Sequence, residues 1–183
     1  YSKFWPLYNE IDKVKNSPKY YNADESAKKQ YDQSAQFAKI HGENQGRGSL
    51  LNQKEIDGLI KFIEAAKDAL NGDKTQKERL QVLADESNTK DSNSKYYNAD
   101  AAKKAEYDKA VEAAKAVLAK ENATQTEIDA AKEKLETAKT ALNGKDTNKA
   151  PLQSLADESN EKEYNPNYYN ADTDKQDAYN KAV

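Results

Sequence analysis

The sequence predicts an all-α protein of tandem three-helix bundles, each a short helix plus a long antiparallel helix pair, forming an elongated rod. The segment Tyr-Tyr-Asn-Ala-Asp occurs three times, starting at Tyr20, Tyr96 and Tyr168. The segment Ala-Leu-Asn-Gly starts at Ala69 and again at Ala141, in phase with the first marker. Between these markers, apolar residues recur every three or four positions, which is the period of an amphipathic helix.

The spacing of the markers divides the chain into units. Successive Tyr-Tyr segments start 76 and 72 residues apart, which indicates one supersecondary unit copied along the chain. We expect a first unit over residues 1–72, a second over residues 75–144, and the start of a third, truncated unit over residues 147–183. The short helix is needed in each unit because a helix hairpin alone leaves much of its apolar face in water.

The second long helix of each unit carries the strongest apolar periodicity. Steps of 3, 4, 3 and 4 residues separate the apolar positions from Ile56 to Leu70 and again from Ile128 to Leu142. This spacing predicts the seam of the antiparallel pair. Gly72 and Gly144 follow these helices, where a left-handed helix end favours glycine.

The first long helix of each unit is expected to start within the Tyr-Tyr segment. In the first unit, Asn22 or Asp24 can accept hydrogen bonds from the free amides of the first turn, and the helix extends to about Ile40. The turn after it is four residues longer in the first unit than in the second. Two residue pairs at these turns have the spacing of a helix cap: Asn52 with Glu55, and Thr124 with Glu127.

The composition predicts a folded chain with a thin core. Leu, Ile, Val and Phe together number 26 of 183 residues, a fraction that ordinarily suggests disorder. The net charge is only −3, however, and Ala and Tyr occupy regular positions. We therefore expect Ala and Tyr to stand in for large aliphatic side chains, with the repeated tyrosines filling the bundle ends and hydrogen-bonding the linkers.

The composition also argues against several kinds of chemistry. The chain has no Cys, so disulfides and thiol nucleophiles are excluded, and its single His, His41, cannot build a zinc site of several histidines. We expect no catalytic residues, no metal site and no cofactor. The 29 basic and 32 acidic residues are interleaved, as on solvated helix faces, so nucleic acid is not an expected partner. No stretch is apolar enough for membrane insertion.

Two irregular features of the first unit are candidates for ligand binding. One is its aromatic start, which the second unit lacks, and the other is the Gly-rich loop over residues 41–48. Irregular loops on a regular scaffold often carry specificity. The structural alternatives are that the aromatic residues cap the first bundle and that His41 is an exposed turn residue. The candidate ligand-binding residues are Phe4, Trp5, Tyr8, His41, Asn44 and Arg47.

The second unit resembles the FIVAR repeat of Gram-positive surface proteins, which include giant extracellular-matrix-binding proteins. The resemblance rests on residues 96–100, 103–104, 107–108, 123–125 and 141–144, and extends more loosely over the first unit. It implies helical bundles in the stalk of an extracellular, cell-wall-anchored adhesin. It also implies attachment to host extracellular matrix, fibronectin in particular.

Several functions remain open at this point. The preferred hypothesis is a monomeric, non-catalytic stalk whose repeats make weak multivalent contacts with the matrix. The first unit is alternatively a dedicated recognition module that uses its loop and aromatic start. A third possibility is an accessory module of a secreted glycan-degrading enzyme, because similar repeats also accompany such enzymes.

Overall fold

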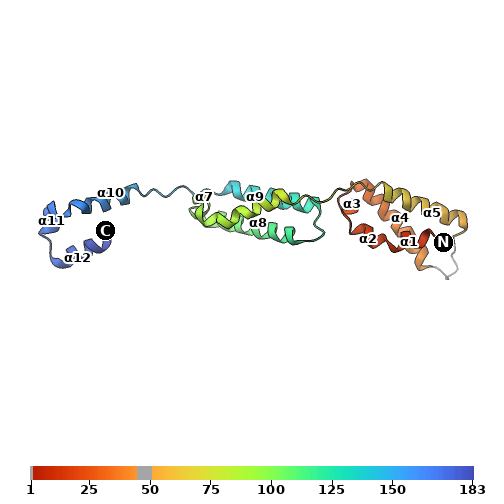
Figure 1. The fold of residues 1–183 in the computed structure, drawn as a ribbon, viewed down its shortest axis with the longest axis horizontal. Helices are drawn as coiled ribbons and strands as arrows, with labels where there is room; N and C mark the ends of the chain where they lie inside the picture. Colours follow the sequence, from red (N-terminus) through yellow and green to blue (C-terminus); the bar gives the residue numbers. More distant parts are fainter. Residues whose placement is uncertain (1, 45–50) are drawn as a thin grey trace.

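Groups of short helices and pairs of long helices follow one another along the chain in the computed structural model, which describes residues 2–44 and 51–183. No β-strand occurs among these residues. Figure 1 shows the helices gathered into bundles that follow one another in a row. The predicted all-α fold of tandem helical bundles is confirmed.

The first unit packs two long helices and three short ones around one core. Its core includes Phe4, Tyr31 and Ile56, each no more than 2% exposed. The predicted single short helix is divided at Glu10 into two helices. The helices are α1 (Phe4–Asn9), α2 (Ile11–Lys15), α3 (Pro18–Tyr21), α4 (Glu25–Glu43) and α5 (Gln53–Asp68).

The second unit has its own core and repeats this arrangement. Leu80, Ala114 and Leu135 are fully buried in it. Among the described residues, the two buried clusters share no residue, so each unit encloses a separate core. The elements are α6 (Glu78–Asp85), the 3₁₀ helix η1 (Glu86–Ser92), α7 (Ser94–Tyr97), α8 (Ala101–Ala119) and α9 (Gln125–Ala141).

The last part of the chain repeats the start of a unit. Leu152 and Leu155, which align with core positions of the second unit, are 71% and 62% exposed here. No residue of its helices is buried. The elements are α10 (Ala150–Glu158), η2 (Ser159–Tyr164), α11 (Pro166–Tyr169) and α12 (Thr173–Ala182).

The second long helix of each complete unit begins with the predicted cap. Side chain and backbone of Asn52 exchange hydrogen bonds with Glu55 at the start of α5, and Thr124 does the same with Glu127 at α9. At the first long helix the prediction was partly wrong. Asp24 occupies the cap position of α4, but its side chain makes no capping hydrogen bond.

Asp24 instead connects the two repeated sequence markers. Its backbone N–H donates to Asn71 Oδ1 over 3.0 Å, and Asn71 Nδ2 donates to Asp24 Oδ2 over 2.7 Å. Alongside, the Gly72 N–H donates to the carbonyl oxygen of Lys19 over 3.0 Å. We call these contacts between Tyr-Tyr-Asn-Ala-Asp and Ala-Leu-Asn-Gly the motif lock.

The second unit contains the same lock. Asp100 and Asn143 form the corresponding two hydrogen bonds over 3.0 and 2.9 Å. The Gly144 N–H donates to the carbonyl oxygen of Lys95 over 3.1 Å. The two markers therefore repeat in phase because they are two halves of one contact, which fastens the start of the first long helix to the end of the second.

The lock also explains the glycine of Ala-Leu-Asn-Gly. Neither Gly72 nor Gly144 has the predicted left-handed conformation. A Cβ on Gly72 would lie 2.1 Å from the carbonyl oxygen of Pro18, and one on Gly144 would lie 2.1 Å from that of Ser94. Glycine is needed because two backbone segments approach closely, and the helix-end interpretation was wrong.

Tyr20, Tyr31, Tyr96 and Tyr107 pack in the two complete bundles as predicted, whereas Tyr97, Tyr169 and Tyr179 are exposed. The hydroxyls of Tyr20 and Tyr96 donate to the first long helix, which the sequence did not predict. Tyr31 is fully buried, and its ring lies edge-on to that of Tyr20 at 5.9 Å. The hydroxyl of Tyr20 donates to Asp32 over 2.6 Å. In the second unit, the hydroxyl of Tyr96 donates to Asp108. The acceptor is thus a carboxylate on the first long helix.

Candidate functional site

The first unit exposes large apolar side chains on its two long helices. Phe37 is 58% exposed, Ile40 is 49% exposed and Phe62 is 37% exposed. The rings of Phe37 on α4 and Phe62 on α5 lie 6.3 Å apart. We call these three residues the apolar patch. Clustered apolar side chains in water are typical of an interaction site.

The second unit lacks this surface. In the repeat register, Phe37 and Ile40 align with Ala113 and Ala116. Phe62 aligns with Lys134. The apolar patch is therefore not required by the bundle fold, because the second unit forms the same helix pair without it.

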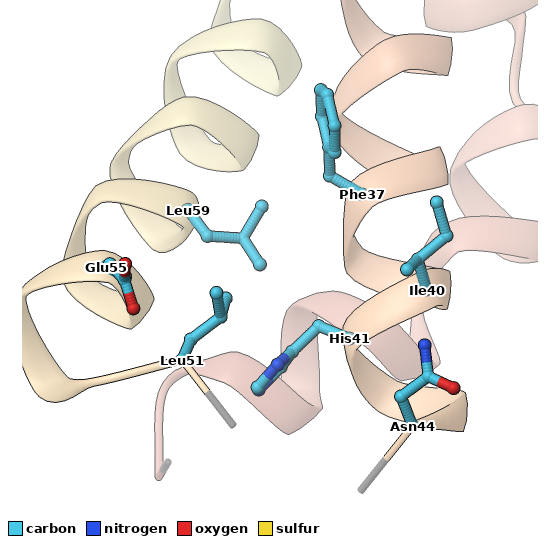
Figure 2. A pocket seen from close by; sticks show the side chains of 7 residues that line it. All are labelled: Phe37, Ile40, His41, Asn44, Leu51, Glu55 and Leu59. Carbon is cyan, nitrogen blue, oxygen red and sulfur yellow. The ribbon is translucent and has the colours of Figure 1, made fainter. Parts of the chain in front are cut away.

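A groove of about 280 Å³ lies beside the patch, at the turn end of the first unit. Figure 2 shows that α4 supplies one wall, with Phe37, Ile40 and His41, while the segment leading into α5 and α5 itself supply the other. Apolar side chains dominate the walls, and a few polar groups are in reach of a ligand, as in many binding grooves. The lining residues are Phe37, Ile40, His41, Asn44, Leu51, Glu55 and Leu59.

His41 is not the exposed turn residue that the sequence suggested. Helix α4 continues to Glu43, so His41 lies within the helix and is only 5% exposed. Its ring packs edge-on against Phe4, with the ring centres 5.0 Å apart. His41 therefore contacts the core of the first unit and also lines the groove.

The aromatic start packs against the same end of the bundle. Phe4 is fully buried, whereas Trp5 and Tyr8 are half-buried. Trp5 contacts both other rings edge-on, at 5.0 and 5.3 Å. The Tyr8 ring fills the space beside Gly42, where a Cβ would lie 2.6 Å from it. This packing favours the capping interpretation, and only Trp5 and Tyr8 keep surface for a ligand.

The remaining two candidates differ in position. Asn44 ends α4 and lines the groove. Arg47 lies outside the described residues. The sequence reasoning missed the apolar patch, although a signal was available: Phe37 and Phe62 are large and apolar where the aligned residues of the second unit are small or charged.

The two tyrosines of the first unit with raised pKa values lie in the core or against it: Tyr31 is buried in the core, and Tyr20 packs against it. Burial, followed by the hydrogen bond to Asp32, raises the pKa of Tyr20 to about 12. Burial and then the carboxylates of Glu10 and Asp12 raise the pKa of Tyr31 to about 12. Both hydroxyls therefore stay protonated at neutral pH, which suits structural roles.

The described part of the chain offers neither a metal site nor a membrane-crossing helix. Residues 2–44 and 51–183 contain no group of three or more His, Asp or Glu side chains placed to hold a metal ion. Within the same ranges, no helix combines the length and apolar character that a membrane crossing requires.

The known proteins that are similar to this chain include two from Staphylococcus aureus. The chain is 38% identical over 112 residues to the Extracellular matrix-binding protein ebh of Staphylococcus aureus, an alignment that covers 48% of this chain and 1% of that protein. The crystal structure of EbhA (756–1003 domain) from Staphylococcus aureus matches with a TM-score of 0.36 and 20% identity, covering 96% of this chain and 90% of that one.

The family assignment rests on the match to the FIVAR domain. Residues 7–71, 77–143 and 149–183 match it. These ranges make up far more than half of the chain, and both complete units, with their locks, lie almost wholly within them. The chain therefore belongs to the FIVAR domain family.

Proposed function

We propose that this chain is a non-catalytic stalk and adhesion segment of an extracellular, cell-wall-anchored protein of a Gram-positive bacterium. Its first unit contacts a protein of the host extracellular matrix, with fibronectin as the first candidate. The apolar patch carries the proposal, because it is present in one of two units that otherwise share the same fold. The name of the Staphylococcus aureus relative, an extracellular matrix-binding protein, supports the class of partner.

The size of the patch predicts weak binding by a single copy. Phe37, Ile40 and Phe62 together expose on the order of 300 Å², whereas each partner in a standard protein interface buries roughly 800 Å². A contact of this size is expected to give a dissociation constant in the micromolar range or weaker. Useful attachment then depends on many linked copies, because a second contact forms at high effective concentration.

The proposal is tested by measuring binding of the purified chain to immobilised fibronectin. The double substitution Phe37→Ala with Phe62→Lys gives the first unit the residues found at the aligned positions of the second. We expect it to weaken binding by about tenfold or more, because it removes both aromatic anchors. Val82→Ala is the control, since Val82 is also an exposed apolar residue, 66% exposed, but lies on the second unit.

The outcomes separate the parts of the proposal. Equal binding by the unsubstituted chain and the double variant would show that the patch is not the contact. Absence of binding to fibronectin and to a panel of other matrix proteins would leave only the stalk role. Nanomolar binding by one copy would instead favour a dedicated recognition module over multivalent adhesion.

A further inference from the structure

We infer that the first two units are held in a fixed orientation by a clamp of two side chains, Asn22 and Thr75, which grips the turn between α8 and α9. We call this pair the joint clamp. It goes beyond the proposed adhesion and does not depend on matrix binding. Its partner surface is the helix–helix turn of the following FIVAR unit.

Asn22 reaches from the first unit to the second. It lies in the loop between α3 and α4, next to the motif lock, and its Oδ1 accepts the backbone N–H of Gln125 over 2.7 Å. Gln125 is the first residue of α9, and the N–H groups of a first helical turn have no partner within their own helix. The side chain of Asn22 therefore supplies an acceptor that the second unit needs.

Thr75 completes the clamp from the connector between α5 and α6. Its hydroxyl accepts from Asn22 Nδ2 over 2.8 Å and donates to the carbonyl oxygen of Ala123 over 2.7 Å. Both Thr75 and Ala123 are buried. A buried carbonyl requires a hydrogen-bond partner, and bonds linked in a chain reinforce one another.

The connector itself is fastened on both sides of Thr75. Asn22 Nδ2 also donates to the carbonyl oxygen of Asp73 over 2.7 Å. Lys77 Nζ donates to the carbonyl oxygen of Lys120 over 2.9 Å. Figure 1 shows this connector running between the α3 end of the first bundle and the turn end of the second. It is thus bound to both units along its length.

The next connector gives an internal comparison. Asn98 Nδ2 donates to the carbonyl oxygen of Lys145 over 2.6 Å and to Thr147 over 3.0 Å, so the same Asn and Thr pair forms. Among the described residues, the hydrogen bonds of this pair remain within its own unit and connector. The pair at the first joint also holds a turn, at Ala123 and Gln125, whereas residues 147–183 do not include the corresponding turn of a third unit.

The clamp is expected to suppress motion of the first unit relative to the second. Units with separate cores and a short connector move relative to one another unless their interface is large. Among the described elements, no helix of the first unit packs extensively on a helix of the second, and the polar contacts between the units are directional. Each hydrogen bond of the clamp fixes the direction of α9 relative to α4, so loss of the clamp should free the orientation of the units without unfolding either core.

The experiment measures the distance between one label on each unit. Because the chain has no Cys, the substitutions Glu64→Cys and Lys109→Cys place nitroxides at two exposed helix positions, and pulsed electron paramagnetic resonance gives the distance distribution. Gln125→Pro removes the N–H that Asn22 accepts, while proline is well tolerated at the first helical position. Gln53→Pro is the matched control, because Gln53 begins α5 in the first unit.

We expect Gln125→Pro to broaden the distribution about twofold or more, toward that of freely jointed units, and Gln53→Pro to leave it unchanged. A second comparison uses Asn22→Ala with Thr75→Val, which should also broaden it, against Asn98→Ala with Thr147→Val, which should not. Far-UV circular dichroism checks that the helices remain. Unchanged width in both joint variants, or equal broadening in the controls, would overturn the inference.

Discussion

Replacing Gly72 with Ala is a direct test of the motif lock. The added Cβ would lie 2.1 Å from the carbonyl oxygen of Pro18 and 2.7 Å from the backbone nitrogen of Ala23. Real Cβ atoms do not approach other heavy atoms so closely, and both neighbours are backbone atoms that cannot rotate away. The end of α5 must therefore separate from the loop that precedes α4.

The loss of folding stability can be worked out from the hydrogen bonds that this separation breaks. The hydrogen bond from Gly72 to Lys19 and the two between Asn71 and Asp24 lie within the lock. Each contributes about 1 kcal/mol, and part of this is recovered by bonds to water. With the steric strain included, we expect the free energy of unfolding of the first unit to fall by about 3 kcal/mol. A change of this size lowers the Tm of such a unit by about 10–25 °C.

Gly58 provides the matched control for the same substitution. It lies in α5, is exposed, and has no heavy atom within 4 Å of the position of an added Cβ. Ala is preferred over Gly in a helix interior by about 1 kcal/mol. Gly58→Ala should therefore raise the Tm of the first unit by about 4–8 °C.

Thermal unfolding of the whole chain, followed by circular dichroism and calorimetry, distinguishes these effects. The transition of the first unit should move down in Gly72→Ala and up in Gly58→Ala, while the second unit, whose lock uses Gly144, should move less. A Gly72→Ala variant with the Tm of the unsubstituted chain would refute the lock as a source of stability. An equal fall in Tm for Gly72→Ala and Gly58→Ala would refute it as well.

Three further predictions concern titratable side chains. Among the described residues, none hydrogen-bonds the buried hydroxyl of Tyr31, so Tyr31→Phe should stabilise the first unit by about 1 kcal/mol in urea unfolding; a loss would contradict this. The pKa of Tyr20 and that of Tyr31 rise from 10.0 to about 12 on folding. The folded state therefore binds more protons between these values, so stability should fall from pH 10 to 12, and tyrosinate absorbance should appear together with unfolding; ionisation of both at pH 10 in the folded state would be the contrary result. Burial acts to raise the pKa of Asp108, but hydrogen bonds from Lys90 and Tyr96 outweigh it and lower that pKa below 3.8. This carboxylate stabilises the second unit above about pH 4 and ceases to do so as the pH falls through the lowered pKa, so Asp108→Asn should flatten the acid limb of stability; an unchanged acid limb would argue against the effect.

The helices could be predicted from the sequence because burial along a helix is a local pattern. The spacing from Ile56 to Leu70 matches the buried face of α5 at Ile56, Ile63 and Ala66, and Leu70 is buried just after the helix ends. At the remaining position of the pattern, Leu59 is half-buried. The helix caps were likewise visible because Asn52 and Glu55 lie three residues apart. Each of these features depends on neighbours within one or two helical turns.

The lock and the joint clamp could not be predicted in this way. Asp24 and Asn71 are 47 residues apart, and Asn22 meets Gln125 across 103 residues. The sequence shows that the two markers repeat in phase, but in-phase repetition does not reveal that they touch. The role of Gly72 was misjudged for the same reason, because the atoms that exclude a side chain come from a distant segment.

The groove residues His41 and Asn44 were predicted as candidates, but the apolar patch was not, because a repeat pattern indicates positions that serve the fold. Phe37 and Phe62 are not repeated, so the repeat pattern gives them no structural role. The prediction for His41 was wrong because the Gly-rich composition around it suggested a loop, whereas the helix extends past it and its ring packs on Phe4.

Repeated and unrepeated positions therefore have different roles in this chain. The repeated markers serve the lock through Asp24, Asn71 and Gly72, whereas the side chain of Asn22, from the same marker, serves the joint. The outer faces of α4 and α5 carry neither duty, since the second unit places Ala113, Ala116 and Lys134 at the same positions and folds in the same way. Those faces can therefore acquire or lose a binding surface without altering the rod. If matrix contact is a property of the first unit, its chemistry belongs on the apolar patch, where substitution leaves the scaffold intact.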